Sequence, residues 1–180
     1  EQPDATIIVH TGYPDVYADN PYVANINVGG MFDRVIDLDL AYEKRPLMHI
    51  VHAYMMEAFG SLSEPADDQQ EMFSGALLQS VSLPHRSVVI HGAGTTWRSR
   101  SRSPAFWSDL HARLQAEGYT TVSVGGPADH GGGTLDMRAT LTLAAIHRLI
   151  RAACCFVGSD SGLLHVAGAT QTPIVGLFTC

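Results

Sequence analysis

Hydrophobic residues occur in short runs separated by turns rich in glycine, proline and acidic residues, as expected for a chain that alternates strands and helices. In the second half the apolar runs predict strands at residues 87–91, 119–124, 154–157 and 174–178. Apolar residues at helical spacing predict helices at 104–117, from 140 or 142 to 153, and at 166–169. This alternation indicates an α/β fold with a parallel sheet.

The first half has a weaker pattern. Apolar runs predict strands at residues 5–10, 22–28 and 34–40, and the remaining segments predict helices at 14–19 and 49–59. The stretch 61–70 is polar and acidic without periodicity, and domain boundaries fall in such stretches. We therefore predict two α/β halves, residues 1–70 and 71–180.

Composition and charge restrict the function classes. The chain has 180 residues, 46% of them hydrophobic, and a net charge of −7, which argues against a nucleic-acid partner. No apolar run reaches about 18 residues, so no transmembrane segment is expected. The start of the chain lacks a basic region before an apolar one, so we expect no signal peptide and a cytoplasmic location.

The sequence does not indicate a metal site or a disulfide framework. Three cysteines form neither a disulfide framework nor a zinc-ligand set, and no acids cluster with histidines at ligand spacing. We expect no metal and no cofactor.

The turn at residues 158–162 carries the first candidate chemistry. It places Asp160 between two serines, after a predicted buried strand and before a helix. Strand ends of this kind bind ligands in open α/β sheets, and the backbone N–H groups there favour anions. In the alternative interpretation, Ser159 or Asp160 only caps the helix. His165, one turn later, is either a packed histidine or a neighbour of a bound phosphate.

A second candidate follows the strand at 87–91. Its loop contains three features that suit an anion: the glycines at 92 and 94, the hydroxyls of Thr95 and Thr96, and an Arg-Ser repeat. The arginines of the repeat, Arg98, Arg100 and Arg102, are candidate phosphate contacts. The other interpretation is a solvated basic loop.

A third candidate is the Gly-Gly-Pro turn at 125–127. Asp129 lies just after it and could bind ribose hydroxyls, or could be a surface turn residue. Weaker candidates in the remaining chain are His10, Thr11, Asp15, Asn20 and Asp136, the last three of which also suit turns and helix caps.

A hydrolase is not favoured. Asp160, Ser161 and His165 start one helix and do not form a line of nucleophile, base and orienting acid. The chain contains no nucleophile-elbow, Walker or complete dinucleotide-binding motif.

The sequence GSDSGLLHVAGA at 158–169, followed by PIVGLF at 173–178, resembles the signature of family 9 glycosyltransferases, the ADP-heptose:lipopolysaccharide heptosyltransferases. Residues 91–107, VGGPAD at 124–129 and residues 135–153 resemble further segments of that family in the same order. A weaker similarity covers 14–21.

The resemblance implies a GT-B fold, with two Rossmann-like halves facing a cleft. The second half would hold a nucleotide sugar, and the first half, reduced here, would present the acceptor. The family's opening strand and Gly-Asp loop, which carries its proposed catalytic acid, has no counterpart before Ala5. The family also continues beyond the position of Cys180, so the chain resembles an excerpt or a reduced form, and its catalytic residue is unassigned.

The resemblance also implies the site. The donor diphosphate would be held by the residues Thr95, Thr96, Arg100, Ser161 and Gly162, with Asp160 near the sugar and His165 near a phosphate. Gly126 and Asp129 would lie near the ribose or base. Arg100 stands where the family has a lysine. Arginine and helix N-termini would carry the leaving charge without a metal.

The expected function is therefore transfer of a heptose or similar sugar from a nucleotide diphosphate donor, such as ADP-heptose, to a saccharide or glycolipid acceptor of the lipopolysaccharide-core type. Such an acceptor would allow peripheral contact with a membrane. The alternative is a non-catalytic module that binds a nucleotide or nucleotide sugar, and a weaker third interpretation is a structural partner subunit.

Overall fold

The computed structural model describes residues 5–62, 72, 82–93 and 101–178. Internal contacts divide the chain into two compact units: Glu1–Val28 together with Gln70–Cys180, and Gly29–Gln69. The first residues thus group with the second half of the chain. The division into halves at residue 70 stays a prediction.

A parallel five-stranded sheet forms the centre of the larger unit, with the strand order β5-β4-β3-β6-β7. The strands are β3 (Ser87–His91), β4 (Thr120–Ser123), β5 (Leu135–Asp136), β6 (Cys155–Ser159) and β7 (Ile174–Leu177). This confirms the α/β class with a parallel sheet. Four of these strands were predicted within a few residues, whereas β5 was not, because two residues show no periodicity.

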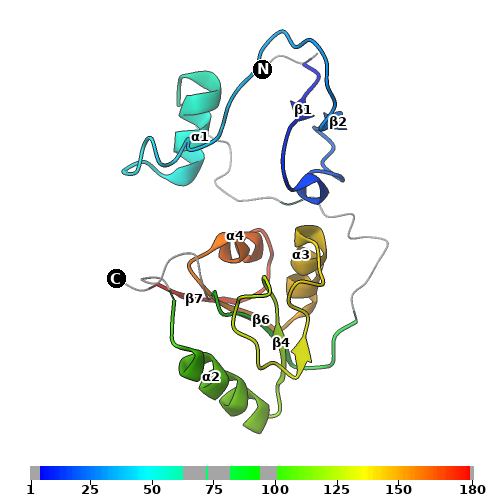
Figure 1. Ribbon diagram of the computed structural model, residues 1–180, viewed down its shortest axis with the longest axis vertical. Coiled ribbons are helices and arrows are strands. Elements are labelled where there is room, and N and C mark those ends of the chain that lie inside the picture. Colours follow the sequence, from blue (N-terminus) through cyan, green and yellow to red (C-terminus); the bar gives the residue numbers. More distant parts are fainter. Residues whose placement is uncertain (1–4, 63–71, 73–81, 94–100, 179–180) are drawn as a thin grey trace. The chain divides into compact units, whose positions relative to one another are not determined.

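Helices cover both faces of this sheet (Figure 1). They are α2 (Pro104–Ala116), α3 (Leu143–Ala152) and α4 (Gly162–Gly168). The hydroxyl of Ser103 accepts a hydrogen bond from the Phe106 N–H and caps α2, and Thr142 caps α3 in the same way. These ends agree with the predicted helices, but α4 begins four residues earlier than the predicted 166.

The alternation of side chains along β3 separates the core into two layers. Val88 and Ile90 pack against Trp107 of α2, which is fully buried. Val89 points to the other face, where it joins Phe156 and the apolar residues of α3 and α4. Because the period is two, His91 lies on the same side as Val89.

The first residues of the chain attach to the larger unit through a helix end. Strands β1 (Ile8–Val9) and β2 (Asn25–Ile26) form a small parallel pair, and the 3₁₀ turn η1 (Pro14–Val16) lies between them. Asp15 Oδ2 accepts a hydrogen bond of 2.9 Å from the N–H of Ala144 in the first turn of α3. Asp15 is therefore a cap, as one of the two sequence interpretations had it, but of a helix 129 residues away.

The smaller unit contains α1 (Ile50–Phe59), which Gly60 ends in the left-handed conformation, as predicted. Glu57 on this helix pairs with Lys44 and Arg45, and the hydrogen bond from Arg45 is the main cause that lowers the pKa of Glu57. The predicted strand at 34–40 is wrong, because the segment has no strand partner and exposes Val35 and Leu38.

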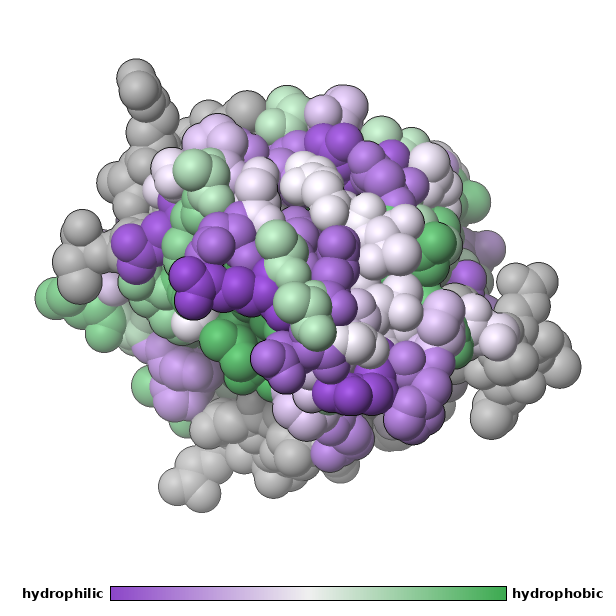
Figure 2. Space-filling view, turned by 90° about the horizontal axis from the view of Figure 1, so that it is seen from below, coloured by the Kyte–Doolittle hydropathy of each residue, from purple (hydrophilic) through white to green (hydrophobic). Residues whose placement is uncertain are grey.

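The surface carries both hydrophilic and hydrophobic residues. Figure 2 shows mostly hydrophilic residues, with hydrophobic ones in small separate areas. Among the described residues, no helix has the length and apolar character needed to cross a membrane.

Two buried histidines should make the stability of the protein depend on pH. Burial is the main cause that lowers the pKa of both His111 and His147 below 6.5. Below pH 6.5 the unfolded chain therefore binds more protons than the folded one, so the free energy of unfolding should decrease as the pH falls from about 6.5. The slope is at most about 1.4 kcal/mol per pH unit for each histidine.

Urea denaturation between pH 8 and pH 5 measures this effect. His147→Gln keeps a donor for the Ala169 carbonyl, which the ring nitrogen contacts at 3.1 Å, and should reduce the slope. His85→Asn, at an exposed position before β3, is the matched control and should leave it unchanged. An unchanged slope in His147→Gln would contradict the assignment.

Candidate functional site

β3 and β6 lie side by side at the point where the order of strands in the sheet reverses. From β3 the chain continues outward to β4 and β5, and it then returns to β6 on the other side of β3. His91 ends β3 and is paired in register with Gly158 of β6. Open α/β sheets bind ligands beyond the carboxyl ends of the strands at this position. The loops after β3, β4 and β6 therefore form the candidate site.

His91 joins two of these loops. Its Nδ1 lies 3.0 Å from Ser161 Oγ in the loop after β6, and its Nε2 lies 3.2 Å from Asp129 Oδ2 in the loop after β4. The ring is buried, with 6% of the side chain exposed, and Asp129 is 16% exposed. Interactions between charged or polar groups are stronger in such a setting than at the open surface.

The Gly-Gly-Pro turn is shaped around this contact. Asp129 Oδ2 also accepts a hydrogen bond of 2.7 Å from the Gly126 N–H. Gly125 has φ +125°, and a Cβ added there would lie 2.4 Å from that oxygen and 2.8 Å from the His91 ring. A larger residue at 125 would therefore force the carboxylate and the imidazole apart.

A second charged pair supports the same loop. Arg138 donates a hydrogen bond of 2.6 Å to the main-chain carbonyl of Asp129 and pairs with Asp136 at 2.6 Å. The hydrogen bond from Arg138 is the main cause that lowers the pKa of Asp136 to about 2. Asp136 thus holds the arginine in place. The alternative prediction that Asp136 caps a helix is wrong, because the next helix, α3, begins at Leu143 and is capped by Thr142.

The predicted turn at 158–162 is only partly a turn. Gly158 and Ser159 are the last residues of β6, and the N–H of Asp160 donates to the Leu177 carbonyl at 3.3 Å. Ser161 is the N-cap of α4, but its side chain makes no capping hydrogen bond. Ser159 does not cap the helix, because its buried hydroxyl makes no hydrogen bond with the described residues. The capping role of Asp160 stays a prediction.

The remaining predicted residues differ in how far the structure describes them. Gly162 starts α4, and His165 is exposed on the same helix. The predicted phosphate residues Thr95, Thr96 and Arg100, with the alternative Arg98, lie outside the described residues. The structure brings Ser161, Asp129 and Gly126 together around His91. The ligand roles assigned to all of these residues stay predictions.

His91 is not among the candidate ligand-binding residues predicted from the sequence. A signal for it exists, since a polar residue follows the apolar run at 88–90 directly before a glycine loop. The side chain could not be assigned from sequence because both of its partners are distant, Asp129 by 38 positions and Ser161 by 70.

The hydroxyl, imidazole and carboxylate form a line that the sequence did not predict. In serine hydrolases the serine faces Nε2 and the acid faces Nδ1, and the acid orients the ring. Here the two nitrogens are exchanged. A buried line of this kind also fixes the relative positions of the loops that carry Asp129 and Ser161, which is the role that its burial supports.

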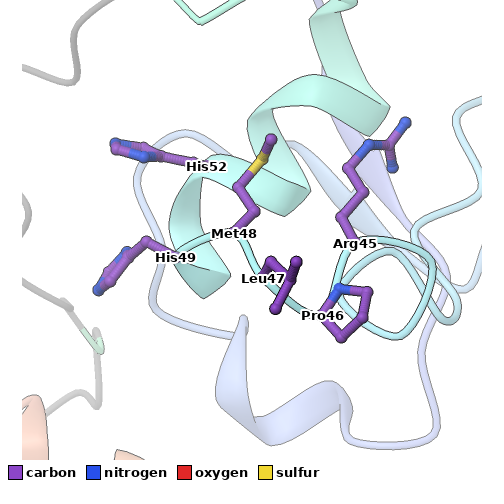
Figure 3. A pocket seen from close by; sticks show the side chains of 6 residues that line it. All are labelled: Arg45, Pro46, Leu47, Met48, His49 and His52. Atoms are coloured by element: carbon purple, nitrogen blue, oxygen red, sulfur yellow. The ribbon is translucent and has the colours of Figure 1, made fainter.

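A hollow lies in the smaller unit. It has a volume of about 550 Å³ and is lined by Arg45, Pro46, Leu47, Met48, His49 and His52. Figure 3 shows the two histidines pointing to the same side, away from Arg45, and their ring centroids are 5.6 Å apart. None of the predicted site residues lines this hollow. Across the described parts of both units, no three His, Cys, Asp or Glu side chains are grouped to hold a metal ion.

Comparison with known structures shows the fold. Escherichia coli ADP-heptose lipopolysaccharide heptosyltransferase II is similar over 98% of this chain and 76% of its own, with 19% identity and a TM-score of 0.71. E. coli heptosyltransferase WaaC, solved with ADP-2-deoxy-2-fluoro heptose, is similar over 72% of this chain and 45% of its own, with 21% identity and a TM-score of 0.53.

A third similar structure is the iron-containing heptosyltransferase TibC of enterotoxigenic E. coli, solved in complex with ADP-D-β-D-heptose. It is 25% identical over 54% of this chain and 28% of its own, with a TM-score of 0.49. The chain thus spans less than half the length of WaaC and of TibC. No curated protein sequence matches it.

The sequence profile of glycosyltransferase family 9 (heptosyltransferase) matches residues 36–180, which is most of the chain and includes the loops after β3, β4 and β6. The resemblance found in the sequence is confirmed. The chain belongs to glycosyltransferase family 9.

Proposed function

We propose that the larger unit binds the nucleotide diphosphate sugar of a heptosyltransferase-type reaction, at the loops after β3, β4 and β6. The single observation that carries this proposal is the His91 cluster. It holds the Ser161 loop and the Asp129 turn together at the switch point of the sheet, where α/β folds bind nucleotides.

Family membership supports the identity of the ligand. WaaC, a heptosyltransferase with a similar fold, was solved with an ADP-heptose analogue. In the sequence, Thr95, Thr96 and Arg100 come after β3, and we propose that they contact the same ligand as Ser161. Hydroxyls, backbone N–H groups and an arginine are the groups that a diphosphate needs when it leaves with added negative charge.

The acceptor side and the transfer step are proposed by analogy with the family. We propose a GT-B arrangement in which a reduced first half presents a saccharide or glycolipid acceptor, in the cytoplasm, and the sugar moves from the diphosphate to an acceptor hydroxyl. Asp160 would contact the sugar, and Gly126 and Asp129 would lie near the ribose or base. The acceptor hydroxyl needs a general base, which has no assigned residue in this chain.

The second candidate function is a binding module without transfer activity. Asp15 favours it, because this first-half carboxylate accepts a hydrogen bond from the first turn of α3 and is engaged in structure. A module of this kind would bind the donor and catalyse no transfer.

Titration calorimetry with ADP-, UDP- and GDP-sugars tests both functions. We expect one of the three to bind the unmodified protein, and Asp160→Ala to weaken that binding about tenfold or more, because a charged hydrogen bond to a sugar hydroxyl is lost. Asp109→Ala, on the exposed face of α2, is the matched control and should bind normally.

The outcomes separate the two functions. Failure of all three sugars to bind would contradict both. Binding without sugar transfer or hydrolysis would favour the module.

The arginine repeat gives a second prediction. Arg100→Ala should weaken binding of the nucleotide sugar about tenfold, because a charge-assisted contact to phosphate is lost, whereas Arg98→Ala should change it less than about threefold. The same calorimetric titration measures both. Equal effects would show that another arginine of the repeat contacts the phosphate.

A further inference from the structure

The hydrogen bond between His91 and Ser161 decides what Ser161 can offer to a ligand. The two side chains are 3.0 Å apart and share one hydrogen, which belongs either to the hydroxyl or to the ring. Ser161 is partly exposed, at the edge of the sheet where we place the donor diphosphate, and His91 is buried behind it. The inference below rests on that proposed function.

The contact with Asp129 settles the position of the hydrogen on the ring. Asp129 Oδ2 already accepts the Gly126 N–H at 2.7 Å and lies 3.2 Å from His91 Nε2. An ionised carboxylate has no hydrogen to donate, so Nε2 must carry one. In a neutral imidazole the other nitrogen, Nδ1, is then an acceptor. With the ring neutral, Ser161 then donates its hydroxyl hydrogen to His91.

This arrangement is unsuited to a phosphate ligand. With its hydrogen directed at His91, Ser161 Oγ presents only lone pairs to the outside, and phosphate oxygens are also acceptors. Ser161 Oγ and a phosphate oxygen that face each other as two acceptors form no hydrogen bond and repel each other. If His91 takes a second proton, on Nδ1, the ring donates to Ser161 Oγ, and the hydroxyl hydrogen becomes free to turn toward the phosphate.

We propose that His91 is a positioning residue that takes up one proton when the diphosphate binds, and that this converts Ser161 from an acceptor into a donor toward phosphate. The proton comes from solvent and goes to Nδ1, and no bond of the ligand breaks. The added positive charge lies between the Asp129 carboxylate and the incoming diphosphate, so it is balanced from both sides.

The other charged groups near this pair are compatible with the proposal. They lie on β5, on the neighbouring loops and on α4: Asp129, His130, Asp136, Arg138, Asp160 and His165. The positive charge of Arg138 is paired with Asp136 at 2.6 Å, and its contact with Asp129 is to the main-chain carbonyl. The group in direct contact with His91 Nε2 is the Asp129 carboxylate.

Calorimetry at pH 8 in two buffers of different ionisation enthalpy measures the proton. The probe is ADP-glucose, or UDP- or GDP-glucose if one of these binds instead. Each phosphate of these sugars has one ester bond and one anhydride bond, so it has no weakly acidic hydroxyl and the ligand itself takes up no proton near neutral pH. We expect an uptake of about one proton per ligand, and an affinity that falls up to about tenfold per pH unit toward alkaline pH. Equal heats of binding in the two buffers, before any correction for buffer ionisation, would show no proton uptake and would overturn the proposal.

Two variants assign the proton. Ser161→Ala leaves the ring in place but removes the hydroxyl that must be turned, so binding should weaken about tenfold and the uptake should fall close to zero. His85→Asn, at an exposed position outside the site, should keep both the affinity and the uptake. Uptake that persists in Ser161→Ala, or disappears in His85→Asn, would overturn the assignment to His91.

The outcomes are distinguishable from those of the proposed function. If none of the three nucleotide sugars binds, the proposed function and this inference both fail. If one binds without proton uptake, only this inference fails.

Discussion

The site depends on a buried imidazole that has one partner on each side. His91 contacts Ser161 through Nδ1 and Asp129 through Nε2, and each partner lies in a loop after a different neighbour of β3. A buried polar ring costs free energy unless both nitrogens are satisfied, so the two loops are held at the positions that satisfy it. The geometry of the sheet edge is thus set by hydrogen-bond demand as well as by apolar packing.

The surrounding structure makes this contact possible. The alternation along β3 turns His91 to the side of α3 and α4, where Ser161 stands directly before the first residue of α4. Gly125, with φ +125°, leaves the space that Asp129 needs to approach the ring. Arg138 then holds the main chain of the same loop. The conformation of Gly125, the alternation along β3 and the hydrogen bond from Arg138 therefore all support the contact between His91 and Asp129.

Most of the larger unit could be predicted from sequence because its signals are local. Helix α2 begins at the predicted residue 104, α3 begins one residue after the predicted 142, and β3 has the predicted bounds. Predictions failed where the deciding contact is distant. The segment 34–40 has strand-like composition but no partner strand, and β5 exists only because Leu135 pairs with Val122. For the site, the loops and the family could be predicted, whereas the residue that joins them could not.

The sequence by itself determined the α/β class, the elements of the second half and the membership of glycosyltransferase family 9, because strand period, helix spacing, caps and motif order are all written along the chain. The tertiary structure alone decided which polar residues meet. Asp15 bonds to α3 across 129 positions, and His91 reaches Ser161 across 70. Such pairings leave no local pattern, because they arise only when the sheet order brings distant loops to one edge.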